Sequence, residues 1–173
     1  MIGTGSGSPA EWSELEAQRG LRFPADYKDF VNHYGYLTVG GYIRVPSPLS
    51  SDPHRGLPAI ISELDHYRKI QVEFGDYFPI KAYPEPGGLL PWATTINGDR
   101  LFWLTRGTPD EWTIVIVESR GPMSEAWPIS MSEFILSFIK GNLRSEVFGD
   151  SASTANPRLE DPREDEPSPS QLS

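Results

Sequence analysis

The residue types that most often carry chemistry are sparse and widely spaced in this chain. Its three histidines, His33, His54 and His66, stand far apart, and none has another histidine three to five positions away. A pair at that spacing would place two imidazoles on one helix face, which is an arrangement that binds zinc. The chain also has no cysteine, and therefore no thiolate nucleophile, disulfide or cysteine-based zinc site. We predict no metal site and no cofactor.

Hydrolase chemistry finds equally little support. A G-x-S-x-G nucleophile elbow is absent. Carboxylates stand close together at Glu63 and Asp65 and at Asp110 and Glu111, but short-spaced acids on polar segments are usually solvated helix or turn charges. Glu16, in the first predicted helix, is interpreted as a capping or ion-pairing residue. We predict no catalytic residue and a noncatalytic protein.

The charge balance argues against binding to nucleic acid. The chain has 15 basic and 24 acidic residues, a net charge of −9, whereas phosphate neutralisation needs clustered Lys and Arg. It has neither an apolar run long enough to span a membrane nor the pattern of a secretion signal. We expect a cytoplasmic monomer. The acidic balance would complement a basic partner, and it is also ordinary for a soluble protein; both interpretations stay open.

The composition divides the chain into three parts. Residues 1–8 are rich in Gly and Ser and predict a flexible leader. Residues 9–149 carry the aromatic and aliphatic residues of a single domain. Residues 150–173, with six acidic and two basic residues among Pro and Ser, predict a disordered tail with a net charge of −4.

The stretch from Leu89 to Glu118 predicts three antiparallel strands, because Asn97-Gly98-Asp99 stands between two apolar runs. Two hairpin registers are possible. A turn at Asn97-Gly98 pairs Ile96 with Asp99, whereas a turn at Gly98-Asp99 pairs Ile96 with Leu101. We favour the second, because apolar cross-strand pairs stabilise a sheet.

Both registers give the same faces to this hairpin. Thr94, Ile96, Leu101 and Trp103 share one face, and Phe102 and Leu104 share the other. Residues 112–117 are apolar at nearly every position, which is typical of a central strand buried on both sides. The sheet therefore needs helices or loops to cover it.

Capping signals and apolar spacing predict four helices around this sheet. Ser8-Pro9-Ala10-Glu11 is a capping box with Pro at the first helical position, and Ser130-Met131-Ser132-Glu133 is a second capping box. The predicted helices run from Pro9 to Gly20, from Phe23-Pro24 to Gly35, over 57–70 and from Ser130 to Gly141. The first strand is predicted at 42–45, a last edge strand at 126–129 and an irregular loop at 75–88.

An ordered series of residues from Trp12 to Gly141 resembles the SUKH superfamily, the Smi/Knr-type domain. The series begins with Trp12 and Glu16, continues through Leu21-x-Phe23-Pro24-x-x-Tyr27-x-x-Phe30 and Tyr34-Gly35, and then Leu90-Pro91 and Asn97-Gly98-Asp99-x-Leu101-Phe102-Trp103, and ends with Pro109-x-x-Trp112-x-Ile114-Val115 and Ser132-x-Phe134. The acidic tail lies outside this pattern, and the loop at 75–88 agrees with it least.

The resemblance implies an α+β fold with a mixed, largely antiparallel sheet and helices packed around it. Its bacterial members look like immunity proteins, which bind and occlude a cognate toxin domain, and its fungal members regulate cell-wall synthesis. The matched positions are expected to be structural: Trp12, Pro24, Tyr27, Phe30, Gly35, Gly98, Phe102, Trp103, Trp112 and Phe134.

The resemblance makes an immunity protein the leading hypothesis, with a toxin domain as partner. A regulatory scaffold of the fungal type and, with the least support, an uncharacterised hydrolase are the alternatives. Loop aromatics and acids outside the expected core are the candidate contacts, because Tyr commonly anchors an interface. They are Tyr36, Tyr42, Asp76, Tyr77, Glu85, Asp110 and Glu111.

Overall fold

The computed structural model describes residues 7–149 and the backbone of the pair Leu159–Glu160. The expected leader lies outside the described residues except for Gly7 and Ser8, and so does the expected disordered tail except for that pair. Gly7 is tied to the domain, since its N–H donates to Asn32 Oδ1 at 3.0 Å. Within the described residues no helix is long and apolar enough to cross a membrane.

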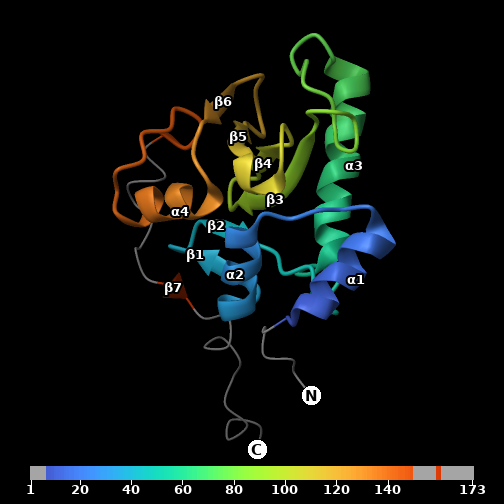
Figure 1. Cartoon of the computed structure of the whole chain (residues 1–173). Helices are drawn as coiled ribbons and strands as arrows, with labels where there is room; N and C mark the ends of the chain where they lie inside the picture. The colour runs from blue at the N-terminus through green and yellow to red at the C-terminus, as the bar shows by residue number, and fades with distance from the viewer. Residues whose placement is uncertain (1–6, 150–158, 161–173) are drawn as a thin grey trace, which may run out of the picture.

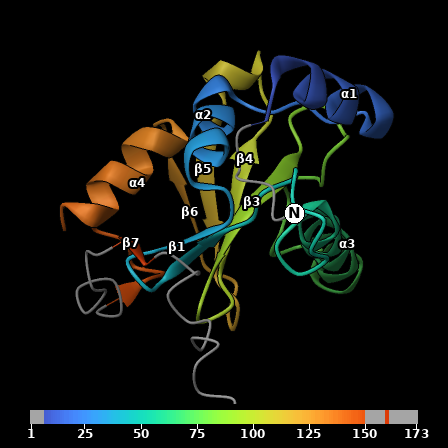
Figure 2. The ribbon, with the colours of Figure 1, turned by 90° about the horizontal axis from the view of Figure 1, so that it is seen from below.

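The predicted α+β fold is confirmed: helices cover both faces of one antiparallel sheet. Figure 1 shows α2 and α4 in front of the sheet and α3 along its side, and Figure 2 shows that α3 lies on the opposite face from α2 and α4. The helices are α1 (Pro9–Arg19), α2 (Ala25–Tyr34), α3 (Leu57–Phe74), the short 3₁₀ helix η1 (Pro109–Glu111) and α4 (Met131–Ile139). The strands are β1 (Leu37–Val39), β2 (Ile43–Val45), β3 (Leu89–Thr95), β4 (Arg100–Leu104), β5 (Thr113–Val117), β6 (Ser124–Trp127) and β7 (Leu159–Glu160).

The sheet is ordered β6-β5-β4-β3-β2-β1-β7, and each neighbouring pair is antiparallel. The strands β3, β4 and β5 are neighbouring interior strands, as the apolar runs predict. Their side chains alternate between two cores. Leu101 and Trp103 face α2 and α4, whereas Phe102 faces α3.

The predicted hairpin register is wrong. Thr94 pairs with Arg100 rather than with Trp103, and Ile96 is exposed in a three-residue loop instead of facing Leu101. Two features shift the register. Trp92 forms a bulge between Pro91 and Ala93, and Gly98, at φ 91°, closes the turn with its N–H on Thr95 O.

Asp99, which the favoured register placed in the turn, instead holds the two strands of the hairpin in register through its side chain. Asp99 is buried at 3% exposure. Its Oδ2 accepts the Thr95 hydroxyl at 2.8 Å, and its Oδ1 accepts the Ser119 N–H at 3.0 Å. A buried carboxylate that accepts both of these hydrogen bonds stabilises the observed register. A prediction based only on apolar cross-strand pairs could not identify this register.

Most predicted element ends are confirmed, with three differences, of which the first is the last strand: it was predicted at 126–129 and is β6 at Ser124–Trp127. Both capping boxes form, and α1 and α2 end at Gly20 and Gly35, which have φ of 60° and 67°. The strand β1 was not predicted, because three residues give too short a pattern. The helix α3 continues to Phe74 beyond the predicted end at Ile70.

The main core lies between the sheet and the helices α1, α2 and α4, and Trp103 is at its centre. The Tyr27 ring stands edge-on to Trp103 at 4.9 Å between centroids, and Trp92 stacks on it at 6.0 Å. A smaller core joins Leu64 and Tyr67 of α3 to the other face of the sheet. Both faces of the central strands are therefore covered.

Candidate functional site

The start of α2 receives its cap from a distant loop. Its N-cap residue is Pro24, whose side chain has no hydrogen-bonding group, so the first amides of the helix need an outside acceptor. Asp110 of η1 provides it, because Asp110 Oδ1 accepts the Ala25 N–H at 2.7 Å. A carboxylate at this position also interacts favourably with the helix dipole.

The same arrangement is repeated between α2 and α4. Asp26 lies in the first turn of α2, and its Oδ2 accepts the Ser132 N–H at the start of α4 at 2.9 Å. Glu133 completes the capping box of α4 through the Ser130 N–H, at 2.9 Å. Carboxylates thus connect η1, α2 and α4 at their N-terminal ends.

A depression of about 220 Å³ opens between these helix ends. The carboxylate residues Asp26 and Asp110 line it, and the rings of Trp103 and Trp112 contribute to it from the core. The indole of Trp112 donates to Gly107 O at 3.3 Å. The other lining residues are Pro24, Ala25, Pro109, Ser130 and Met131.

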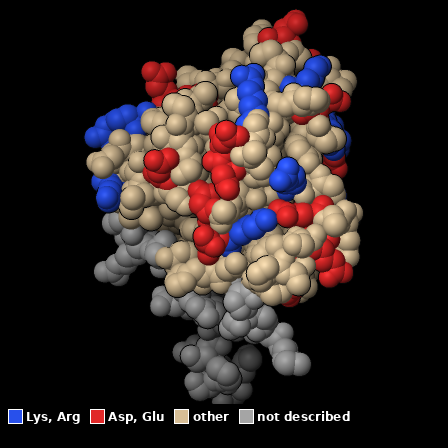
Figure 3. Space-filling model, viewed as in Figure 1, with Lys and Arg blue, Asp and Glu red and all other residues tan. Residues whose placement is uncertain are grey.

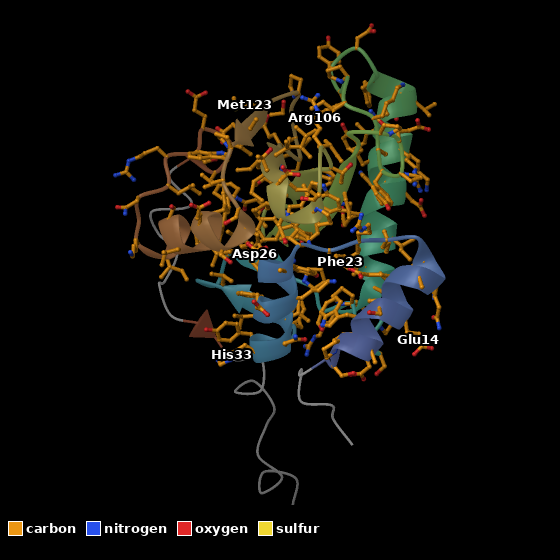
Figure 4. The ribbon with its side chains drawn as sticks, viewed as in Figure 1. Glu14, Phe23, Asp26, His33, Arg106 and Met123 are labelled. Atoms are coloured by element: carbon orange, nitrogen blue, oxygen red, sulfur yellow. The ribbon has the colours of Figure 1, made fainter. Side chains whose placement is uncertain are left out.

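Acids that line the depression, or that lie within three positions of a lining residue, form an exposed negative surface, which we call the acidic face. It comprises Asp26, Asp29, Asp110, Glu111 and Glu133, of which Asp26 alone is partly buried. Figure 3 shows acidic side chains gathered down the middle of this view, over α2, with several basic side chains beside them and others at the edges, and Figure 4 labels Asp26 there.

Hydrogen bonds hold part of this surface in its charged form. Glu111 accepts the backbone N–H and the hydroxyl of Thr108 at 2.7 and 2.8 Å, and these bonds lower the pKa of its carboxyl below the usual value. Asp29, three positions after Asp26 on α2, is exposed. The acidic face is therefore suited to electrostatic contact with a basic surface rather than to proton transfer.

Comparison with known proteins gives one family. Residues 9–135 match the SUKH_6 family model, described as SMI1-KNR4 cell-wall. The chain belongs to the SUKH family. Neither the curated proteins nor the solved structures compared with it gave a match. The SUKH match covers every helix and strand of the fold up to the first half of α4.

The residues that carried the resemblance hold the SUKH fold together. The rings of Trp12, Tyr27, Phe102, Trp103, Trp112 and Phe134 are buried, and Phe30 is partly buried against them. Pro24 is the N-cap of α2, while Gly35 and Gly98 have positive φ. Glu16, interpreted as a capping or ion-pairing residue, accepts the Phe23 N–H at 2.9 Å and pairs with Lys28 at 2.7 Å.

The seven candidate contact residues do not form one surface. Asp110 and Glu111 belong to the acidic face of the SUKH domain. Asp76, Tyr77 and Glu85 are exposed at or beyond the C-terminal end of α3.

Two candidate tyrosines lie elsewhere. Tyr36 lines a separate groove beside α3, where the Arg55 guanidinium lies 5.0 Å from its ring centroid. Tyr42 was expected outside the core, and that expectation is wrong. It is 2% exposed and packs against Phe138 and Phe148, because the turn before β2 directs its ring under α4.

The histidines lie in three different places. His33 contacts the ring of Tyr34, His54 lies in the loop before α3, and His66 is exposed on α3. Burial and the neighbouring Arg100 lower the pKa of His66. In the part of the chain that the structure describes, no three His, Cys, Asp or Glu side chains come together as a metal site.

Sequence reasoning missed Asp26, Asp29 and Glu133 as members of the acidic face. Asp26 and Glu133 carried a local signal, since each is an acid in the first turn of a predicted helix. Nothing local indicates that three helix N-termini meet. That meeting depends on the packing of α4 beside α2, with the Asp26 contact to Ser132 spanning 106 positions.

Proposed function

We propose that this SUKH protein is a noncatalytic binding protein of the immunity type, which occludes a cognate toxin domain through its acidic face. Three observations support this proposal. Membership of the SUKH family makes a noncatalytic binding protein the general expectation. The acidic face provides exposed carboxylates beside a shallow depression bordered by aromatic residues. The net charge of −9 adds a long-range attraction for a basic partner.

The observation that carries the proposal is the carboxylate network at the three helix ends. Asp26 and Asp110 are held by backbone amides of other elements, so these charges are presented in defined positions. A preorganised charged surface loses little side-chain entropy on binding. Complementary charge then accelerates and orients the encounter.

Co-expression with a candidate toxin domain, sought in the neighbouring genes, is the first test. We expect rescue of growth and co-purification of the two proteins. If neither occurs, the immunity proposal fails for that pair.

A charge reversal then tests the acidic face itself. Asp29→Lys changes an exposed acid of this face that makes no ion pair with the described residues. We expect association slower by on the order of threefold to tenfold, with the difference shrinking at high salt. Glu73→Lys, an equally exposed acid on α3, is the matched control and should leave association nearly unchanged. Equal effects of the two substitutions would show that only net charge matters.

A regulatory scaffold is the second candidate, because the matching family model is described by its link to the cell wall. Removal of Ser151 to Ser173 separates the two functions. A scaffold that recruits partners through this tail loses them, whereas an immunity protein continues to protect.

A further inference from the structure

A second concave surface lies on the other side of the sheet, and we call it the α3 groove. It has a volume of about 480 Å³ and runs between the first turns of α3 and the strands β2 and β3. Arg44 and Thr94 line it from the strands, and Ser62 and Glu63 line it from the helix. Tyr36 also lines it. The acidic face, by contrast, belongs to the side of α2 and α4.

The α3 groove carries a cation, Arg44, that has no ionic partner among residues 7–149. Glu63 is the carboxylate among its lining residues, and Arg100 Nε binds it at 2.7 Å. Arg44 is exposed on β2, and its guanidinium makes neither an ion pair nor a hydrogen bond with any residue from 7 to 149. Arg55 lies beside Tyr36, but it already pairs with Asp52 at 3.7 Å, so Arg44 is the cation left for a ligand in this part of the described chain. The groove therefore suits a carboxylate ligand.

The strand pairing places the start of an acidic segment next to this groove. Thr38 of β1 pairs with Arg44 of β2 on one side and with Glu160 of β7 on the other. Because β7 runs antiparallel to β1, continuing the register would put residue 162 opposite Tyr36. β7 thus runs in the direction of Tyr36, which lines the groove.

The residues that follow β7 have the charge and the reach to fill the groove. They read Asp161-Pro162-Arg163-Glu164-Asp165-Glu166, with four carboxylates and one cation. β7 and β2 are two strand spacings apart, about 10 Å, whereas six extended residues reach about 20 Å. We propose that the α3 groove is a binding site for a carboxylate-rich segment, and that residues 161–166 of the same chain occupy it, with a carboxylate on Arg44.

A spin label close to the acidic segment tests this directly. The chain has no cysteine, so Ser168→Cys provides a unique attachment point that keeps every acid of the segment. In the labelled full chain, the amide signals of Ala59 and Ser62, which line the groove from α3, are expected to be lost by paramagnetic broadening. The signal of Ser132, at the start of α4 on the other side of the sheet, is expected to remain.

Charge reversal shows whether Arg44 is the contact. Arg44→Glu should restore the lost signals, and Arg44→Gln should restore them without adding an acid. Arg120→Glu, an exposed arginine after β5, is the matched control and should leave the broadening intact. About 1 M salt, where the Debye length is about 3 Å, should also restore the signals.

Three results would overturn the proposal. The first is persistence of the groove signals in the labelled chain that carries Ser168→Cys and no other substitution. The second is broadening that survives both Arg44 substitutions. The third is broadening of an unlabelled, isotope-enriched chain by a separate labelled chain, which would make the occupant a second copy. None of these results bears on toxin protection, so this inference and the proposed function fail separately.

Discussion

The Asp110 carboxylate accepts a hydrogen bond from the Ala25 N–H at 2.7 Å, across 85 positions of sequence. The bond fastens η1, in the connection between β4 and β5, to the start of α2. It replaces the cap that Pro24 does not provide. One contact therefore stabilises a helix and fixes part of the acidic face.

Removing this cap should cost stability without unfolding the protein. Asp110→Ala is expected to lower the free energy of unfolding by about 1 kcal/mol, the usual cost of losing a cap. Asp110→Asn keeps a side-chain carbonyl acceptor and should lose less. Urea denaturation of the three proteins measures the difference, and equal losses for Ala and Asn would show that the hydrogen bond is unimportant.

Truncation at the centre of the core should be far more damaging. Trp103→Ala is expected to cost about 3 to 5 kcal/mol, because the ring is fully buried and stacked among aromatic residues. Its indole N–H donates to no acceptor in the described chain, so the loss is one of packing. Thermal and urea unfolding measure it. A fully stable variant that failed to bind its partner would place Trp103 in an interface instead.

The hairpin anchor gives a third prediction. Asp99→Ala leaves the Ser119 N–H and the Thr95 hydroxyl without their acceptor, at an expected cost of about 2 to 3 kcal/mol. Asp76→Ala, which changes an exposed acid of the loop after α3, is the control and should stay near the wild-type value. If both variants unfold at the same urea concentration, the carboxylate does not determine the register.

Tyr67 predicts how stability depends on alkaline pH. Burial raises the pKa of its phenol to about 12. The folded protein therefore holds the proton more tightly than the unfolded chain, whose pKa is near 10. This contribution to stability is fully present below pH ~10 and is lost as the pH rises toward ~12.

Tyr67→Phe isolates that contribution. The variant loses the 2.7 Å hydrogen bond to Ile80 O, so it should be less stable by about 1 kcal/mol at neutral pH. Its stability should fall less steeply than that of the wild type over the alkaline range. If the free energy of unfolding falls equally steeply with pH in the two proteins, groups other than Tyr67 cause the loss of stability at alkaline pH. Urea denaturation between pH 8 and pH 12, about the range set by the two pKa values, provides the measurement.

The sequence by itself determined the elements that local rules specify. Capping boxes at Ser8 and Ser130 and glycines at positions 20 and 35 located helix ends, because these signals act within a few residues. Apolar runs located the central strands and required cover on both faces. The family motif consists of core residues, so it identified the fold and not the binding surface.

Only the tertiary structure decided what depends on contacts between distant segments. The hairpin register follows from donors that Asp99 meets as far away as Ser119, and the burial of Tyr42 follows from the packing of α4 and Phe148 over it. The acidic face exists because α2, η1 and α4 bring their N-terminal ends together. The spacing of acids along a chain does not indicate which helix ends will meet, since packing alone brings each carboxylate to a backbone N–H that lies 85 or 106 positions away.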